Sequence, residues 1–122
     1  PTWNGVQPCA APICPTGSFQ AIKHKCADRM VKVESARSAA YYAGCAVAEN
    51  NEAEIDTVAP LAKAYCSDAY FQAAADCIQI HGGVGFTSEY DVHLYFKRAK
   101  SSESLLGDAT HHRELLAQRI GL

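Results

Sequence analysis

Apolar side chains recur every three or four residues along the first half of the chain, beginning abruptly at Ser18. Positions three and four apart lie on the same side of an α-helix, so this spacing predicts one helix over residues 18–49. We expect it to end at Asn50-Asn51. The row of side chains predicted to form its apolar face is Phe19, Ile22, Cys26, Met30, Val33, Ala36, Ala40, Ala43 and Val47.

A second helical pattern follows a polar connection at residues 52–57. Asp56 or Thr57 is expected to cap the start of this helix, with Pro60 tolerated in its first turn. Gly82 is expected to end it. Its apolar face is a stripe of mostly small residues, which permits a close approach between helices: Ala62, Cys66, Ala69, Ala73, Cys77 and Ile80.

Two shorter helices complete the pattern. Thr87 or Ser88 is expected to cap the third, whose apolar period continues to Leu106 and is broken by Gly107. Asp108 is well placed to cap the last helix. No stretch alternates between apolar and polar residues as a strand would, so the predicted fold is all-α, an antiparallel four-helix bundle with short loops over residues 17–122. Residues 1–16 contain four prolines and no period, and they predict an irregular arm.

Length and charge narrow the classes of function. A chain of 122 residues is long enough for one domain with its own core. Eleven basic and thirteen acidic residues nearly balance, which argues against nucleic-acid binding. No apolar run of about 18 residues predicts a membrane span, and no charged-then-apolar leader marks secretion. We therefore expect a cytoplasmic protein without a nucleic-acid or membrane partner.

The six cysteines favour neither a disulfide framework nor a zinc site, because none forms a C-x-x-C pair. Cys26, Cys45, Cys66 and Cys77 occupy small-apolar positions of helical patterns, and we expect them to be reduced and buried. His111 and His112 are adjacent, so on a helix their side chains point about 100° apart and do not chelate one ion together. No metal ligands are predicted.

The most informative stretch runs from Gln79 to Lys100 and reads QIHGGVGFTSEYDVHLYFKRAK. Gly82, Gly83 and Gly85 lie between two helical patterns. One interpretation is a plain turn that ends a helix. The other is that the glycines strip side chains from a short piece of backbone so that a ligand or another chain can approach it. The motif is not a dinucleotide fingerprint, since no strand precedes it, and no P-loop is present.

This stretch resembles the C-terminal helical-bundle motif of acyl-CoA dehydrogenases, FAD enzymes that oxidise the α,β bond of acyl-CoA thioesters. The resemblance extends through Ser101–Ile120 and back through Gly17–Glu49. It implies that the Q-x-x-G-G-x-G-F loop reaches the ADP part of an FAD held mainly by a neighbouring subunit. By that similarity Gln79, Gly82 and Gly83 face the cofactor, and Asp108 and Thr110 fall where the family places polar contacts to FAD. The family also implies an oligomer and an electron-transferring flavoprotein as the electron acceptor.

Three departures from the family pattern bear on activity. Where members usually read R-x-x-F-G-x-P-I before residue 17, this chain has Cys9 and Pro12 in place of the Arg and the Phe. Many members place the catalytic Glu directly before the Gly of E-G-T, and Leu106 occupies that position here. Other members place the base on an earlier helix of the bundle, which this chain lacks.

These departures predict a C-terminal domain of an FAD-dependent acyl-CoA dehydrogenase that is inactive, and without retained FAD, as an isolated chain. No residue is assigned as catalytic. The main alternative is a non-catalytic assembly module that contacts FAD and pairs with a larger dehydrogenase subunit. A more remote alternative is a metal-binding helical protein that uses the cysteines and histidines.

Overall fold

The computed structural model describes residues 16–122, and the regular secondary structure in that part of the chain is entirely helical. The elements are the 3-10 helix η1 (Thr16–Ser18), α1 (Gln20–Ala48), α2 (Glu52–His81), the 3-10 helix η2 (Gly82–Phe86), α3 (Val92–Ser104) and α4 (Ala109–Ile120). The prediction of an all-α fold is confirmed. The predicted irregular arm at residues 1–16 lies almost entirely outside the described residues.

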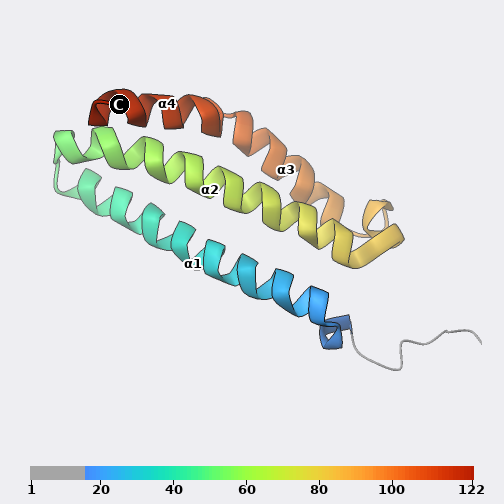
Figure 1. The fold of residues 1–122 in the computed structure, drawn as a ribbon. Helices are drawn as coiled ribbons and strands as arrows, with labels where there is room; N and C mark the ends of the chain where they lie inside the picture. The colour runs from blue at the N-terminus through green and yellow to red at the C-terminus, as the bar shows by residue number, and fades with distance from the viewer. Residues whose placement is uncertain (1–15) are drawn as a thin grey trace, which may run out of the picture.

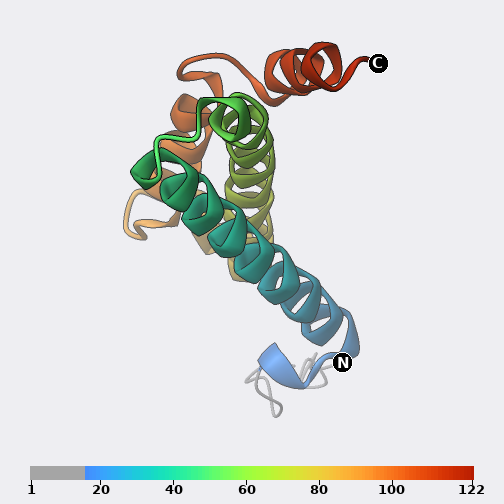
Figure 2. The ribbon, with the colours of Figure 1, turned by 90° about the vertical axis from the view of Figure 1, so that its left-hand side faces the viewer.

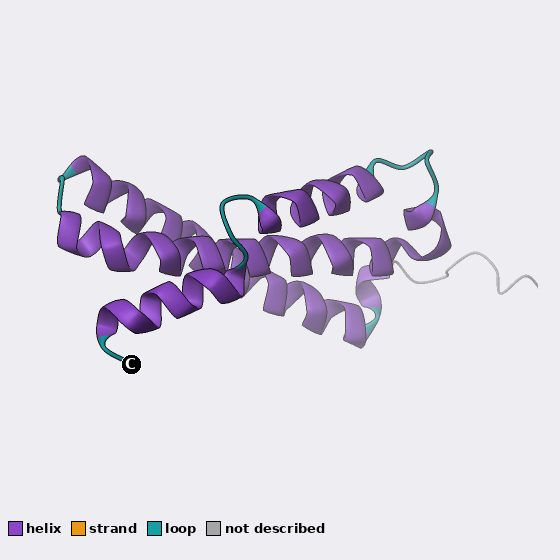
Figure 3. Cartoon of the chain, turned by 90° about the horizontal axis from the view of Figure 1, so that it is seen from above, coloured by secondary structure: helices purple, strands orange, loops and turns teal. Residues whose placement is uncertain are grey.

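Helix α2 lies at the centre of the arrangement. It packs against α1 on one side and against α3 and then α4 on the other (Figure 1). α1 and α2 run antiparallel and are joined by a short connection (Figure 2), while α4 splays away from α2 toward the C-terminus (Figure 3). The predicted antiparallel bundle is therefore arranged in layers around α2. The two short helices α3 and α4 together cover the side of α2 that faces away from α1.

The start of α2 differs from the prediction. Glu52 begins the helix, and Asn51 caps it by accepting a hydrogen bond from the Glu54 N–H at 3.4 Å. The predicted caps Asp56 and Thr57 are wrong, because Asn51 provides the cap earlier and the acidic first turn suits the positive end of the helix dipole.

Pro60 consequently lies inside α2 rather than in its first turn. A proline has no N–H, so the Asp56 carbonyl four residues earlier loses its helical donor. Arg119 of α4 supplies one instead, donating to the Asp56 carbonyl oxygen and pairing with the Asp56 carboxylate at 2.9 Å. The proline that would weaken a solitary helix thus becomes a docking point for α4.

The predicted end of α2 and start of α4 are confirmed, whereas the predicted start of α3 is corrected. Gly82 ends α2, and Asp108 caps α4 by accepting from the His111 N–H at 2.8 Å, both as predicted. The predicted caps Thr87 and Ser88 are wrong, since α3 begins only at Val92. The Thr87 hydroxyl instead donates back to the Val84 carbonyl at 2.8 Å and closes η2.

The apolar row predicted for α1 coincides only at Ile22, Ala36 and Ala43 with the face that packs against α2. The less exposed positions of α1 are Ile22, Lys25, Arg29, Lys32, Ala36, Ala39, Ala43 and Ala46. Most of the predicted row is instead exposed, including Phe19, Met30, Val33 and Val47. The polar residues on the face that packs against α2 form hydrogen bonds and ion pairs with polar side chains of α2. The spacing of apolar residues alone does not predict such contacts.

Small side chains fill the interior. Its buried apolar residues are Ala46, Val58, Ala62, Ala64, Ala69, Ala74, Ile78, Ala99 and Ala109. The cysteines with described positions are free, as predicted, but they are not buried as predicted: Cys26, Cys45 and Cys77 are exposed and Cys66 is half-buried. Burial raises the pKa of the Cys66 thiol, and the nearby Lys63 only partly offsets this.

A polar cluster joins the N-terminal half of α1 to the C-terminal half of α2. Arg29 donates to Asp76 at 2.5 Å and to Gln72 at 2.7 Å, and Lys32 also donates to Gln72. Lys25 lies 3.4 Å from the Asp76 carboxylate. Burial alone would raise the pKa of Asp76, but the hydrogen bonds from Arg29 and Lys25 outweigh it and lower that pKa.

Replacing Asp76 with Asn should lower the free energy of unfolding at pH 7 by about 1 kcal/mol, because two cations lose their charged acceptor. The Asp76 pKa is lowered in the fold, so its contribution is present above the ordinary carboxyl value of about 3.9 and is lost as pH falls through the native value. Urea unfolding followed by circular dichroism from pH 7 to pH 3 should therefore show the two proteins converging at low pH. Asp28→Asn, at an exposed position of α1, is the control, and an equal loss there would contradict the assignment.

Candidate functional site

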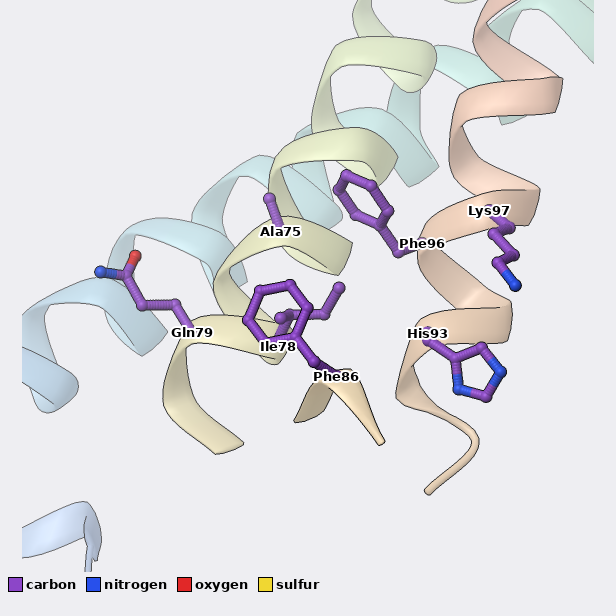
Figure 4. Close-up of a pocket in the computed structure, with 7 residues that line it drawn as sticks. All are labelled: Ala75, Ile78, Gln79, Phe86, His93, Phe96 and Lys97. Atoms are coloured by element: carbon purple, nitrogen blue, oxygen red, sulfur yellow. The ribbon is translucent and has the colours of Figure 1, made fainter. Parts of the chain in front are cut away.

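A groove opens where α2 ends and the chain turns into α3. Its volume is about 760 Å³, and its lining residues are Ala75, Ile78, Gln79, Phe86, His93, Phe96 and Lys97. In Figure 4 the Phe96 ring projects from α3 toward α2, whereas the His93 ring and the Lys97 side chain project from α3 away from α2. Phe96 also packs on Phe71 of α2, with ring centroids 5.3 Å apart. The groove is an apolar trough with polar groups at its rim.

Gln79 stands at the edge of this groove and extends toward α1 (Figure 4). Its side-chain amide oxygen, Oε1, accepts a hydrogen bond from the Lys25 ammonium group at 2.9 Å. This contact orients the amide and leaves its NH₂ group as an outward donor at an exposed position. The residue is therefore fixed from one side and accessible from the other.

The three glycines of the loop serve three different purposes. Gly82 has φ +64°, a conformation that side chains rarely adopt, and it stops α2. Gly85 is buried, and a Cβ there would lie 2.8 Å from the Ile78 carbonyl oxygen. Gly83 meets neither condition, since a Cβ there has no atom within 4 Å and its φ is ordinary. Of the three, only Gly83 has no reason inside the described chain to be glycine.

The second group of predicted residues lies elsewhere. Asp108 caps α4 with its carboxylate, and Thr110 is exposed in the first turn of that helix. This end of α3 meets α2 at Lys63, which contacts the Ser102 carbonyl. Lys63 precedes Gln79 by 16 residues, so the two groups are separated by ~24 Å along α2. The structure does not bring Asp108 and Thr110 together with Gln79, Gly82 and Gly83.

Leu106 lies in the turn before Asp108 and is 83% exposed. It has φ +63°, and its carbonyl oxygen accepts a hydrogen bond from His112 Nε2 at 2.9 Å. The sequence had placed Leu106 within the period of α3, but that helix ends at Ser104. Periodicity gave no indication that His112 and Lys63 would meet at this turn.

The described residues include no group of three or more His, Cys, Asp or Glu side chains placed to hold a metal ion. His111 and His112 lie edge to face, with ring centroids 5.4 Å apart. Within the same part of the chain, no helix is both long enough and apolar enough to cross a membrane.

Comparisons with known proteins agree on one family. Residues 14–121 match the family model described as "Acyl-CoA dehydrogenase, C-terminal domain". Acyl-CoA dehydrogenase IpdE2 of Mycolicibacterium smegmatis is 43% identical over 93 residues, which cover 76% of this chain and 28% of that protein. Acyl-CoA dehydrogenase FadE34 of Mycobacterium tuberculosis is 42% identical over 93 residues, covering 76% of this chain and 13% of that protein.

A solved structure shows the same fold. A chain from the structure titled "Electron transferring flavoprotein of Acidaminococcus fermentans: Towards a mechanism of flavin-based electron bifurcation" superimposes with a TM-score of 0.79 at 29% identity. The match covers 85% of this chain and 27% of that chain. The matched part of the chain therefore spans between 13% and 28% of the length of these proteins.

The roles of the glycines can be separated by alanine substitution. Gly85→Ala should lower the free energy of unfolding by roughly 1–3 kcal/mol, because the new methyl group overlaps the Ile78 carbonyl. Gly83→Ala should change it by less than about 0.5 kcal/mol, since the methyl group enters open space. Chemical denaturation of the two variants measures the difference. Equal losses would show that Gly83 is constrained by the fold after all.

Proposed function

The chain belongs to the acyl-CoA dehydrogenase family, and we propose that it acts as the C-terminal helical domain of an FAD-dependent enzyme that oxidises the α,β bond of acyl-CoA thioesters. In this proposal its glycine loop contacts FAD, and it contributes no catalytic base. The family match covers most of the chain and supports the domain assignment. The activity belongs to a whole enzyme, of which this chain corresponds to about a quarter.

The observation that supports FAD contact best is the open space around Gly83. A glycine without an internal reason is expected where another molecule needs bare backbone. Gln79 beside it offers an outward amide donor already oriented by Lys25. These groups suit a phosphate-bearing ligand that reaches the end of α2, because amide donors and a nearby cation both favour negative charge.

Bound FAD would supply the acceptor for the hydride that leaves the β-carbon. The part of this chain in that event is to bind and orient. Gln79 would donate through its NH₂ group, and Gly83 would admit the ligand to van der Waals contact with the backbone. Thr110 is exposed and can donate through its hydroxyl, whereas the Asp108 carboxylate is already engaged in capping α4.

Proton removal from the α-carbon is the step that this chain does not supply. Leu106 occupies the position where many family members have the catalytic carboxylate, and a hydrocarbon side chain accepts no proton. Glu103, the acidic residue one turn earlier, pairs with Lys100 at 2.7 Å. The proposal therefore assigns the base to another polypeptide or to a part of the protein outside this sequence.

An assembly role is the second candidate, favoured by the large apolar side chains that point outward. Met30 is 69% exposed and Tyr41 is 72% exposed, both on α1. Patches of this kind mark surfaces that another protein covers. The chain would then pair with copies of itself or with a larger dehydrogenase subunit, and the assembled enzyme would deliver electrons to an electron-transferring flavoprotein.

We expect the purified chain to be colourless and to leave an artificial electron acceptor unreduced when given FAD and acyl-CoA substrates. A few loop contacts do not offset the entropy lost when a large cofactor binds. Leu106→Glu should also be inactive, because a carboxylate alone does not hold the flavin. Visible absorption and acceptor reduction over a series of acyl-chain lengths measure both outcomes.

A yellow protein with near-stoichiometric flavin would contradict the cofactor part of this expectation. Substrate-dependent acceptor reduction that disappears in Glu103→Gln would show that the base has been misassigned. Flavin retention should then be measured again after a candidate partner subunit has been added to the purified chain. If the assembly role is correct, the complex should retain flavin, and Gly83→Ala should weaken that retention.

A further inference from the structure

The turn between α3 and α4 is held in a conformation that its sequence does not favour. Leu106 has φ +63° and Gly107 has φ +102°. The left-handed conformation at a residue such as Leu is disfavoured by about 1–2 kcal/mol, so surrounding contacts must maintain it. Two polar side chains reach this turn, one from α2 and one from α4.

Lys63 approaches the turn from α2. Its ammonium group lies 2.8 Å from the Ser102 carbonyl oxygen and 3.4 Å from that of Glu103, both in the last turn of α3. The last carbonyls of a helix have no donor within the helix, and a cation there also suits the negative end of the helix dipole. A further bond to the buried Ser67 hydroxyl at 2.8 Å keeps the ammonium in place.

His112 approaches the same turn from α4. Its Nε2 lies 2.9 Å from the Leu106 carbonyl oxygen. A carbonyl only accepts, so Nε2 must carry the proton. The other ring nitrogen, Nδ1, is buried and has no partner among the described residues. Within the described residues, the hydrogen bond that this ring makes is the one to the Leu106 carbonyl.

The neighbouring residues leave little room for a different turn. A Cβ at Gly107 would lie 2.7 Å from His111 Cδ2, and the His111 N–H is engaged by the Asp108 cap. The carbonyl of Leu106 is thus fixed inward, while its side chain is almost fully exposed. Whatever residue stands at position 106 is presented outward from a fixed backbone.

We propose that Lys63 and His112 are positioning residues that fix the backbone at position 106 and so aim its side chain away from the bundle. The functional significance of this side-chain direction rests on the proposed function, in which position 106 corresponds to the catalytic carboxylate of other family members. Neither residue touches substrate in this scheme. They set the direction in which position 106 points, and the turn keeps that geometry although its residue is Leu.

Nuclear magnetic resonance of the chain tests this directly, because a positive φ brings a residue's own amide and Hα protons unusually close. The wild-type chain should show a strong intraresidue amide–Hα cross-peak at Leu106. Lys63→Met and His112→Phe should each reduce that cross-peak to the level of ordinary residues in α3, as the released turn relaxes to negative φ. Lys23→Met, at an exposed position near the start of α1, is the matched control and should leave it unchanged.

Helix content from circular dichroism shows whether each variant is folded. A cross-peak retained in a folded Lys63→Met or His112→Phe variant, or absent from the wild type, overturns the proposal. If Lys63→Met does not fold, His112→Phe decides the result from the other side of the turn. The measurement uses neither FAD nor acyl-CoA, so its failure is distinguishable from a failure of the proposed function.

Discussion

Close contact between α2 and three other helices is the constraint on which the rest of the structure depends. Small side chains allow a helix to be surrounded in this way, and four of the eight buried positions of α2 are alanine. Each alanine buries little apolar area, so the hydrophobic contribution per residue is modest. Polar contacts therefore specify how the helices meet: Arg29 with Asp76, Arg119 with Asp56, and Lys63 with the end of α3.

The same constraint explains the surface and the site. Many large apolar side chains point outward from α1 and from the turns, while Phe96 of α3 packs on Phe71 of α2. The two groups of predicted FAD-contacting residues lie at different places along α2 rather than around one pocket. A domain of this shape offers parts of a site to its neighbours, in keeping with relatives that are several times longer.

Sequence patterns predicted the helices well because apolar periodicity, Gly82 and Asp108 act locally. They failed where a distant contact decided the outcome. The face of α1 is turned by cations that pair across the interface with Asp76 and Gln72, and Pro60 is accommodated by Arg119 from the other end of the chain. At the site, the glycine motif was visible, but the difference between Gly83 and Gly85 depends on what a Cβ would meet. Lys63 and His112 gave no local indication of their role.

Light scattering at about ten micromolar is the most direct measurement of whether the outward apolar side chains are covered by another copy of the chain. A helical layer that buries mainly alanines and exposes Met30, Val33 and Tyr41 should exist as a dimer or a larger assembly. Substituting Met30 and Val33 with Lys should shift it toward monomer while helix content is retained. A wild-type chain that remains a stable monomer at this concentration would contradict the view that the bundle is built to be covered.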